Sequence, residues 1–195
     1  MTPELALALA IALPALGAVM IGLLGRWPNV REGATLVTAI LLALNVAYLF
    51  SIAHEGAELT LLGIDDGLSL SFRLEPLGAL FAAVASGLWI VNSLYSIGYM
   101  RGNEEKNQTR FYVCFAIALA SAMGVALSAN LVTMFLFYEA LTLSTYPLVA
   151  HKGDEKARKG AAIYLGILLG TSIGLLLPAI IATQYFAGTT EFTRG

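Results

Sequence analysis

The chain has 195 residues, of which 58% are hydrophobic and 12% are charged, and its formal net charge is −2. A water-soluble domain carries roughly 25% charged residues, so this composition excludes an ordinary soluble protein. The slightly acidic balance also excludes a nucleic-acid-binding protein, which would carry a basic patch. The single cysteine, Cys114, lies inside an apolar stretch, so the chain cannot form a disulfide or a cysteine-based metal site by itself.

Six apolar stretches are long enough to cross a bilayer, whose hydrocarbon core requires a helix of roughly 20 residues. In chain order they are residues 5–24, 34–52, 76–100, 111–129, 131–150 and 161–186. The third begins at Pro76, and proline is favoured at the first position of a helix. The sequence therefore predicts an all-α membrane protein, a bundle of about six transmembrane helices forming one domain over residues 1–195.

A short segment between the second and third stretches has a different pattern. Leu68, Leu70, Phe72 and Leu74 alternate with polar residues, a period of two that is typical of a half-buried strand. Residues 65–67 read Asp-Asp-Gly, which favours a hairpin turn, and a second short apolar segment precedes them. We predict a β-hairpin over residues 59–74 outside the membrane, and an irregular loop is the alternative.

Lysine and arginine residues are distributed unevenly among the connecting loops. Nine of the eleven fall in three loops that share one side of the membrane if there are six helices: Arg26, Arg31, Arg101, Lys106, Arg110, Lys152, Lys156, Arg158 and Lys159. Cytoplasmic loops of membrane proteins carry this excess of positive charge. We therefore expect these three loops in the cytoplasm, with the N-terminus, the hairpin and the C-terminus on the outer side.

Small residues recur every four positions in two of the predicted helices. Gly166, Gly170 and Gly174 do so in the sixth stretch, and the fourth carries Ala116, Ala120, Gly124 and Ser128. Residues at this spacing share one helix face, and small faces let membrane helices approach closely. The glycine stripe predicts helix packing, either inside one bundle or across a dimer interface.

Glu139 is the main candidate for a functional residue. It lies near the middle of the fifth stretch and is the only ionisable acidic or basic residue well inside any of the six. A carboxyl group at membrane depth is costly and persists mainly where it faces a bundle interior or a water-filled cavity. We predict that Glu139 binds and releases protons. A protonated Glu139 that only hydrogen-bonds a neighbouring helix is the structural alternative.

Several polar groups follow Glu139 in the same stretch. Pro147 removes one backbone donor and so frees the carbonyl of Leu143 to hold water. His151, whose ordinary pKa is near neutrality, lies at the far end and is a candidate for proton transfer to the cytoplasm, although an ordinary interfacial histidine is the alternative. The candidate proton path therefore consists of Thr142, Ser144, Thr145, Tyr146 and His151.

The fifth stretch and the start of the sixth resemble a known family. Residues 137–153 read FYEALTLSTYPLVAHKG, and residues 156–160 read KARKG. This pattern resembles the antiporter-like membrane subunits of Mrp-type cation/proton antiporters, respiratory complex I and membrane-bound hydrogenases. Among these it is most similar to the Mrp-type D subunit. The predicted hairpin and the outer N-terminus also match this family.

The resemblance implies that Glu139 is the family's proton-site glutamate, which pairs with a lysine on a broken seventh helix. Family members are longer and contain two inverted repeats with broken helices. The present chain ends at Gly195, just past its sixth predicted helix, so we expect an N-terminal portion of such a subunit or one piece of a split one. The lysine partner is then expected from another segment or chain.

We therefore expect a proton- and cation-translocating subunit of a multisubunit monovalent cation/proton antiporter in a prokaryotic plasma membrane. One alternative is a proton-pumping subunit of a complex I-like oxidoreductase or hydrogenase. The other is a truncated subunit that serves assembly and has no transport path of its own. The resemblance implies no cofactor in this chain, and the expected partners are other membrane subunits, the lipid bilayer, protons and a monovalent cation.

Overall fold

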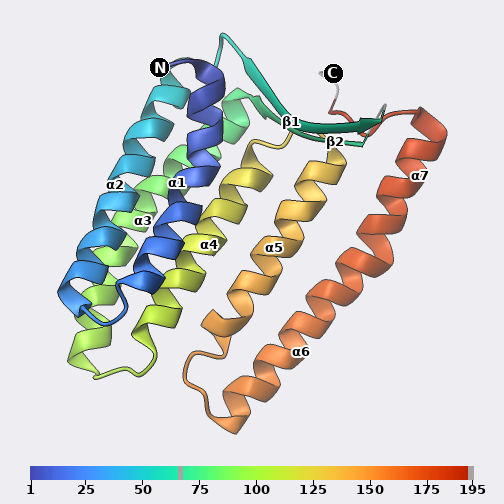
Figure 1. The fold of residues 1–195 in the computed structure, drawn as a ribbon. Coiled ribbons are helices and arrows are strands. Elements are labelled where there is room, and N and C mark those ends of the chain that lie inside the picture. The colour runs from blue at the N-terminus through green and yellow to red at the C-terminus, as the bar shows by residue number, and fades with distance from the viewer. Residues whose placement is uncertain (66–67, 193–195) are drawn as a thin grey trace.

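The structure is a computed structural model that describes residues 1–65 and 68–192 (Figure 1). Helices α1 to α4 form one group, α5 packs beside α4, and the last helical segment lies at the edge. The elements in chain order are α1 (Pro3–Leu23), α2 (Pro28–Ser51), β1 (Ala57–Asp65), β2 (Leu68–Leu74), α3 (Pro76–Gly102), α4 (Gln108–Ala126), α5 (Leu131–Val149), α6 (Glu155–Thr171), a π-helical turn η1 (Ser172–Leu176) and α7 (Leu177–Ala187). In the described part of the chain, six helical spans are long and apolar enough to cross a membrane, as predicted.

The two ends of the bundle differ in what they carry. The N-terminus, the hairpin and the segment after α7 lie at one end (Figure 1). The turns between α1 and α2, α3 and α4, and α5 and α6 lie at the other (Figure 1). This second end, which we call the basic end, bears the nine Lys and Arg residues that the sequence analysis grouped on one side, in the turns and in the helix ends beside them.

The helix starts explain where the observed boundaries differ from the predicted ones. Helix α2 begins at Pro28, because proline fits the first helical turn, and it therefore includes Arg31, which was predicted to lie in a loop. Helix α6 begins at Glu155, because the side chain of Asp154 accepts a hydrogen bond from the backbone N–H of Ala157 at 2.6 Å. The first turns of both helices are polar. The apolar stretches therefore begin later than the helices do, at residues 34 and 161.

The hairpin is present and lies across the ends of the helices. Strands β1 and β2 pair antiparallel, with Leu59 opposite Phe72 and Ala57 opposite Leu74. Phe72 and Leu74 are fully buried against the helices, as the period-two pattern predicted. The predicted turn residues Asp66 and Gly67 lie outside the described residues.

The core runs through the group formed by α1 to α4. Large buried side chains such as Trp89 fill its centre, and small residues bring the helices close together. The α4 stripe behaves as predicted: Ala116 is fully buried, and a Cβ added at Gly124 would overlap the ring of Phe137 from α5. Helix α5 therefore approaches α4 along a glycine contact.

The last span departs from the prediction of one continuous helix. It is α-helical as far as Thr171, passes through η1 and resumes as α7, whose first turn contains Pro178. This span is the least buried of the six. The stripe of Gly166, Gly170 and Gly174 meets nothing within 4 Å of an added Cβ among the described residues, so it does not pack inside this chain. Its role in packing against another helix stays a prediction.

Candidate functional site

Helix α5 is positioned by contacts at its start. The side chain of Asn130 caps the helix by accepting a hydrogen bond from the N–H of Thr133 at 2.7 Å. Its amide group donates to the carbonyl of Ser69 at 3.0 Å and to the hydroxyl of Ser71 at 2.7 Å, both in β2. Asn130 is 1% exposed, so this tie between the hairpin and α5 is shielded from solvent. The contact through Asn130 therefore sets the position of α5 along the helix axis relative to the hairpin.

Glu139 lies eight residues into α5, about 12 Å along the axis at 1.5 Å per residue. Val132, Phe135 and Glu139 follow the three- and four-residue spacing that places residues on one helix face. Val132 and Phe135 line an apolar cavity of about 420 Å³ together with residues of α7, including Ile180. Glu139 therefore faces the α6–α7 span.

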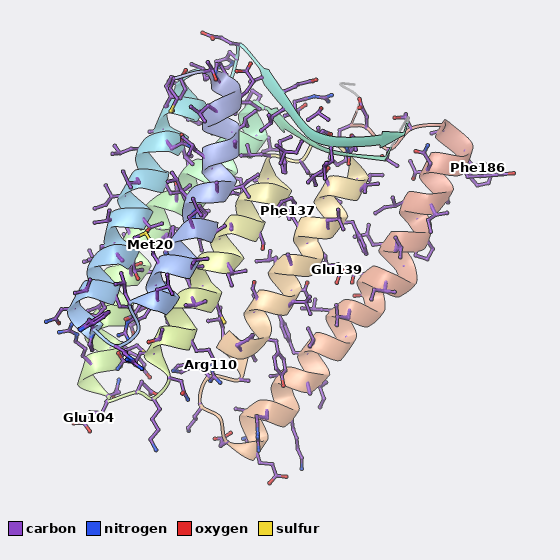
Figure 2. The ribbon with its side chains drawn as sticks, in the orientation of Figure 1. Met20, Glu104, Arg110, Phe137, Glu139 and Phe186 are labelled. Carbon is purple, nitrogen blue, oxygen red and sulfur yellow. The ribbon has the colours of Figure 1, made fainter. Side chains whose placement is uncertain are left out.

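Figure 2 shows the same arrangement, with Glu139 on the side of α5 that faces the last helical span. Phe137 lies elsewhere on the helix and packs edge-on against Phe72 of the hairpin, with ring centres 5.5 Å apart. Phe137 thus anchors α5 to α4 and to the hairpin. The Glu139 side of α5 faces the α6–α7 span, which is the least buried of the six.

The carboxyl group of Glu139 has unmet hydrogen-bonding capacity. Its Oε1 atom is buried, and no hydrogen-bond partner reaches it from residues 1–65 or 68–192. A buried acceptor without a donor is costly, and the cost is relieved by a proton, by water or by a cation. The arrangement therefore suits a carboxyl that exchanges a proton or interacts with a positive charge supplied from outside these residues.

The polar residues after Glu139 separate into two groups. Thr142 and Tyr146 lie three and seven positions further on, which places them on the Glu139 face. Ser144 donates to the carbonyl of Leu141, and Thr145 donates to the carbonyl of Thr142, both at 2.8 Å, so these two hydroxyl protons bond within α5. The structure thus brings Thr142 and Tyr146 into line with Glu139.

His151 occupies a different environment. Its ring packs edge-on against Phe111 of α4, with centres 5.5 Å apart, and its Nε2 lies 3.9 Å from an oxygen of Glu105. Burial lowers the pKa of His151 below its ordinary value, the Glu105 carboxylate opposes this shift, and Arg110 adds to it. His151 therefore lies on the α4 side at the basic end, away from the Glu139 face. Its part in a proton path stays a prediction.

One buried ionic cluster was not predicted. Glu32 accepts hydrogen bonds from Arg31 at 3.1 Å and from Arg101 of α3, and both Arg31 and Glu32 are 4% exposed. Arg31 also donates to Thr109 of α4 at 3.0 Å and lies 5.1 Å from the ring centre of Tyr112. The cluster joins α2, α3 and α4 at the basic end. Pro28, three residues before Arg31, was the signal that the helix had already begun.

In the described ranges, no group of three or more His, Cys, Asp or Glu is close enough to hold a metal ion. Among the described residues, Glu139 is the acidic side chain that lies near the middle of a candidate membrane span. These features define the class: a multi-pass membrane protein of the kind that carries an ionisable group within its bundle.

Comparisons with known proteins identify the family. Residues 128–194 match the family described as "NADH:quinone oxidoreductase/Mrp antiporter, TM", and residues 65–112 match "NADH-Ubiquinone oxidoreductase (complex I), chain 5 N-terminus". Together the two matches cover more than half of the chain. The chain belongs to the family of Mrp-type and complex I-like antiporter subunits.

Curated relatives include the Na(+)/H(+) antiporter subunit A1 of Staphylococcus aureus strains bovine RF122 / ET3-1 and JH9. Both are 30% identical over 126 residues, or 62% of the present chain. The match spans only 15% of the length of these relatives. They are A subunits, so the closer similarity to the D subunit stays a prediction.

Two solved structures share the fold. The chain superposes on a subunit of the membrane-bound sulfane sulfur reductase, an archaeal respiratory membrane complex, with a TM-score of 0.81, 18% identity and 96% of the chain covered. It superposes on the Mrp complex from Dietzia sp. DQ12-45-1b with a TM-score of 0.76, 23% identity and 98% coverage. The chain covers 38% and 20% of those two chains, respectively.

Proposed function

We propose that the chain acts as part of a proton- and cation-translocating subunit in a multisubunit monovalent cation/proton antiporter. Glu139 is then the residue that binds and releases the proton. The observation that carries this proposal is the buried Oε1 of Glu139, which no described residue hydrogen-bonds, on the α5 face toward the last span. The Na(+)/H(+) antiporter relatives support a cation/proton exchange.

The cationic partner of Glu139 is proposed to come from another segment or subunit. Among the described residues, no lysine or arginine forms an ion pair with Glu139; the basic side chains that do pair lie near the two ends of the bundle. A positive charge approaching the carboxyl stabilises its ionised form, and withdrawal of that charge favours proton uptake. Movement of such a partner is therefore sufficient to alternate proton uptake and release.

The proposed setting is a prokaryotic plasma membrane with the basic end in the cytoplasm. This orientation is supported by the nine Lys and Arg residues that lie in the three turns of the basic end or in the helix ends beside them, because the cytoplasmic ends of membrane helices carry this excess. The hairpin and both ends of the chain then face outward. Other membrane subunits of the complex are proposed as partners, as the relatives belong to such assemblies.

The direct test is cation-driven proton flux in inverted vesicles from cells that carry the native complex. Glu139→Gln preserves size and hydrogen bonding but cannot release a proton, so flux should be abolished while the complex still assembles. Glu55→Gln, the same chemical change at an exposed turn, is the matched control and should retain full flux. Unchanged flux in Glu139→Gln would favour the alternative of a structural subunit.

A redox-driven complex is the second candidate. It is favoured by the match of residues 65–112 to a complex I subunit and by the fold shared with a respiratory membrane complex. The two candidates differ in the driving force. Proton movement that requires electron transfer, and not a cation gradient, would identify the redox setting, with Glu139 keeping the same role.

A further inference from the structure

A hollow of about 380 Å³, which we call the α3 hollow, opens at the hairpin end of the bundle where α3 begins. Its rim contains Arg73, near the end of β2, and Glu75, directly after that strand. The rest of its lining is mostly apolar and includes Leu77 and Phe81 of α3 and Met134 of α5. The lining therefore changes from charged to apolar in the direction in which α3 enters its candidate membrane span.

The apolar part of this lining continues along an exposed face of α3. The face consists of residues at three- and four-residue spacing, each between 54% and 78% exposed: Leu77, Phe81, Val84 and Leu88. From Leu77 to Leu88 it extends about 16 Å at 1.5 Å per residue. One half of a ~30 Å hydrocarbon core is about 15 Å thick, so this face matches the depth of the acyl chains in one leaflet. A charged rim above an apolar face of this length has the shape and polarity of a site for one phospholipid.

The charges at the rim do not balance. The guanidinium group of Arg73 pairs with Glu58, lies 3.8 Å from Glu191, and donates to the carbonyl of Phe192 at 2.7 Å. The side chain of Glu75 does not cap α3, and no Lys, Arg or His among the described residues forms an ion pair with it. One positive and three negative side chains give this region a net charge of −2. Such a rim attracts a cationic group and repels an anionic one.

We propose that the α3 hollow binds a phospholipid with a primary ammonium headgroup, phosphatidylethanolamine. The ammonium group donates hydrogen bonds to the carboxylate of Glu75, and one acyl chain lies along α3 from Leu77 to Leu88. The phosphate lies at the first turn of α3, where the N–H groups of Leu77 and Gly78 have no acceptor inside the helix and no side-chain cap. This site uses neither Glu139 nor the span that faces it, so it does not depend on the proposed function.

The class of lipid is tested by photo-crosslinking of the native complex in vesicles of equal parts phosphatidylethanolamine and phosphatidylglycerol. A trace of one lipid or the other carries a diazirine in its acyl chain, and mass spectrometry locates the labelled residues. We expect the ethanolamine probe to label α3 between Leu77 and Leu88 at least threefold more than the glycerol probe. The exposed α2 residues Val37 and Leu44, which do not line the hollow, should be labelled equally by both. Equal labelling on α3 would overturn the recognition of the ammonium group, and no labelling there would show that a protein segment covers the hollow instead.

The role of Glu75 is tested by variants in the same assay. Glu75→Gln keeps the size of the side chain but removes its charge, so the preference for the ethanolamine probe should disappear, and Glu75→Asp should keep most of it. Glu55→Gln, at an exposed turn of the same end, should leave the preference unchanged. A preference that persists in Glu75→Gln would refute the contact. If that variant does not assemble, a phosphatidylcholine probe on the wild-type complex tests the same contact, because its quaternary ammonium cannot donate a hydrogen bond. Its labelling of α3 should fall to the level of the glycerol probe, and labelling equal to that of the ethanolamine probe would contradict the proposal.

Discussion

The tie between Asn130 and the hairpin makes a quantitative prediction about stability. In Asn130→Ala, the N–H of Thr133 loses its side-chain acceptor at a position that is fully buried. One buried donor left unsatisfied costs about 1–3 kcal/mol. The lost bonds to Ser69 and Ser71 add about 1 kcal/mol together, because each oxygen keeps another partner. The expected loss in free energy of unfolding is therefore about 2–4 kcal/mol.

The assay is reversible unfolding of the chain by SDS in mixed detergent micelles, followed by far-UV circular dichroism. Asn130→Ser keeps an oxygen that caps the helix but does not reach the hairpin, so it should lose about half as much as Asn130→Ala. Asn103→Ala removes an exposed amide that donates to Tyr99 and should cost less than about 0.5 kcal/mol. A loss below about 1 kcal/mol for Asn130→Ala would refute the argument that this residue fixes α5 to the hairpin.

Three further outcomes are expected from the same unfolding assay. Glu32→Ala leaves the buried guanidinium of Arg31 without its carboxylate and should cost about 3–5 kcal/mol. Gly124→Leu forces the ring of Phe137 aside and should cost about 1–3 kcal/mol or more. Burial lowers the folded-state pKa of His151, so the stability that the neutral ring provides should fall as pH drops from about 6.5 through that lowered pKa. His151→Phe should remove this pH dependence.

Each of these outcomes has a matched comparison. Glu4→Ala changes an exposed carboxylate and should cost far less than the Glu32 variant, and similar losses would contradict the buried cluster. Gly170→Leu adds the same side chain where nothing lies within 4 Å, so it should leave the isolated chain nearly unaffected. If that variant instead weakens assembly of the complex, the glycine stripe contacts a partner helix. A pH profile shared by wild type and His151→Phe would show that another group titrates.

Some features were predictable because one local pattern determined them. The alternation in residues 68–74 sufficed for the hairpin, since a strand buries every second side chain and Phe72 and Leu74 are indeed fully buried. The position of Glu139 near the middle of α5 followed from its place near the middle of an apolar stretch. The six spans followed from length and composition in the same way.

Other features depended on residues distant in sequence. Charged residues normally mark the end of an apolar span, so the sequence places Arg31 and Glu32 outside the second helix. Their burial depends on hydrogen bonds to Thr109 and Arg101, which come from other helices. The sequence alone predicts one continuous proton path from Thr142 to His151. The helix twist instead places Thr142 on the Glu139 face, and Phe111 holds His151 elsewhere. Helical periodicity shows which residues share a face of the helix, but it does not show which neighbouring element that face contacts.

The hairpin contact also determines how motion in α5 is distributed along its length. With its first turn tied to β2 through Asn130, α5 behaves as a lever whose pivot lies at the end opposite the basic loops. A tilt of about 5° would move Glu139, roughly 12 Å from the pivot, by only about 1 Å. The same tilt would move the far end of the helix more than twice as far. A neighbouring subunit that pushes on the basic end of α5 therefore acts on the longer arm of the lever. A given displacement of that end moves the Glu139 carboxyl by less than half as much.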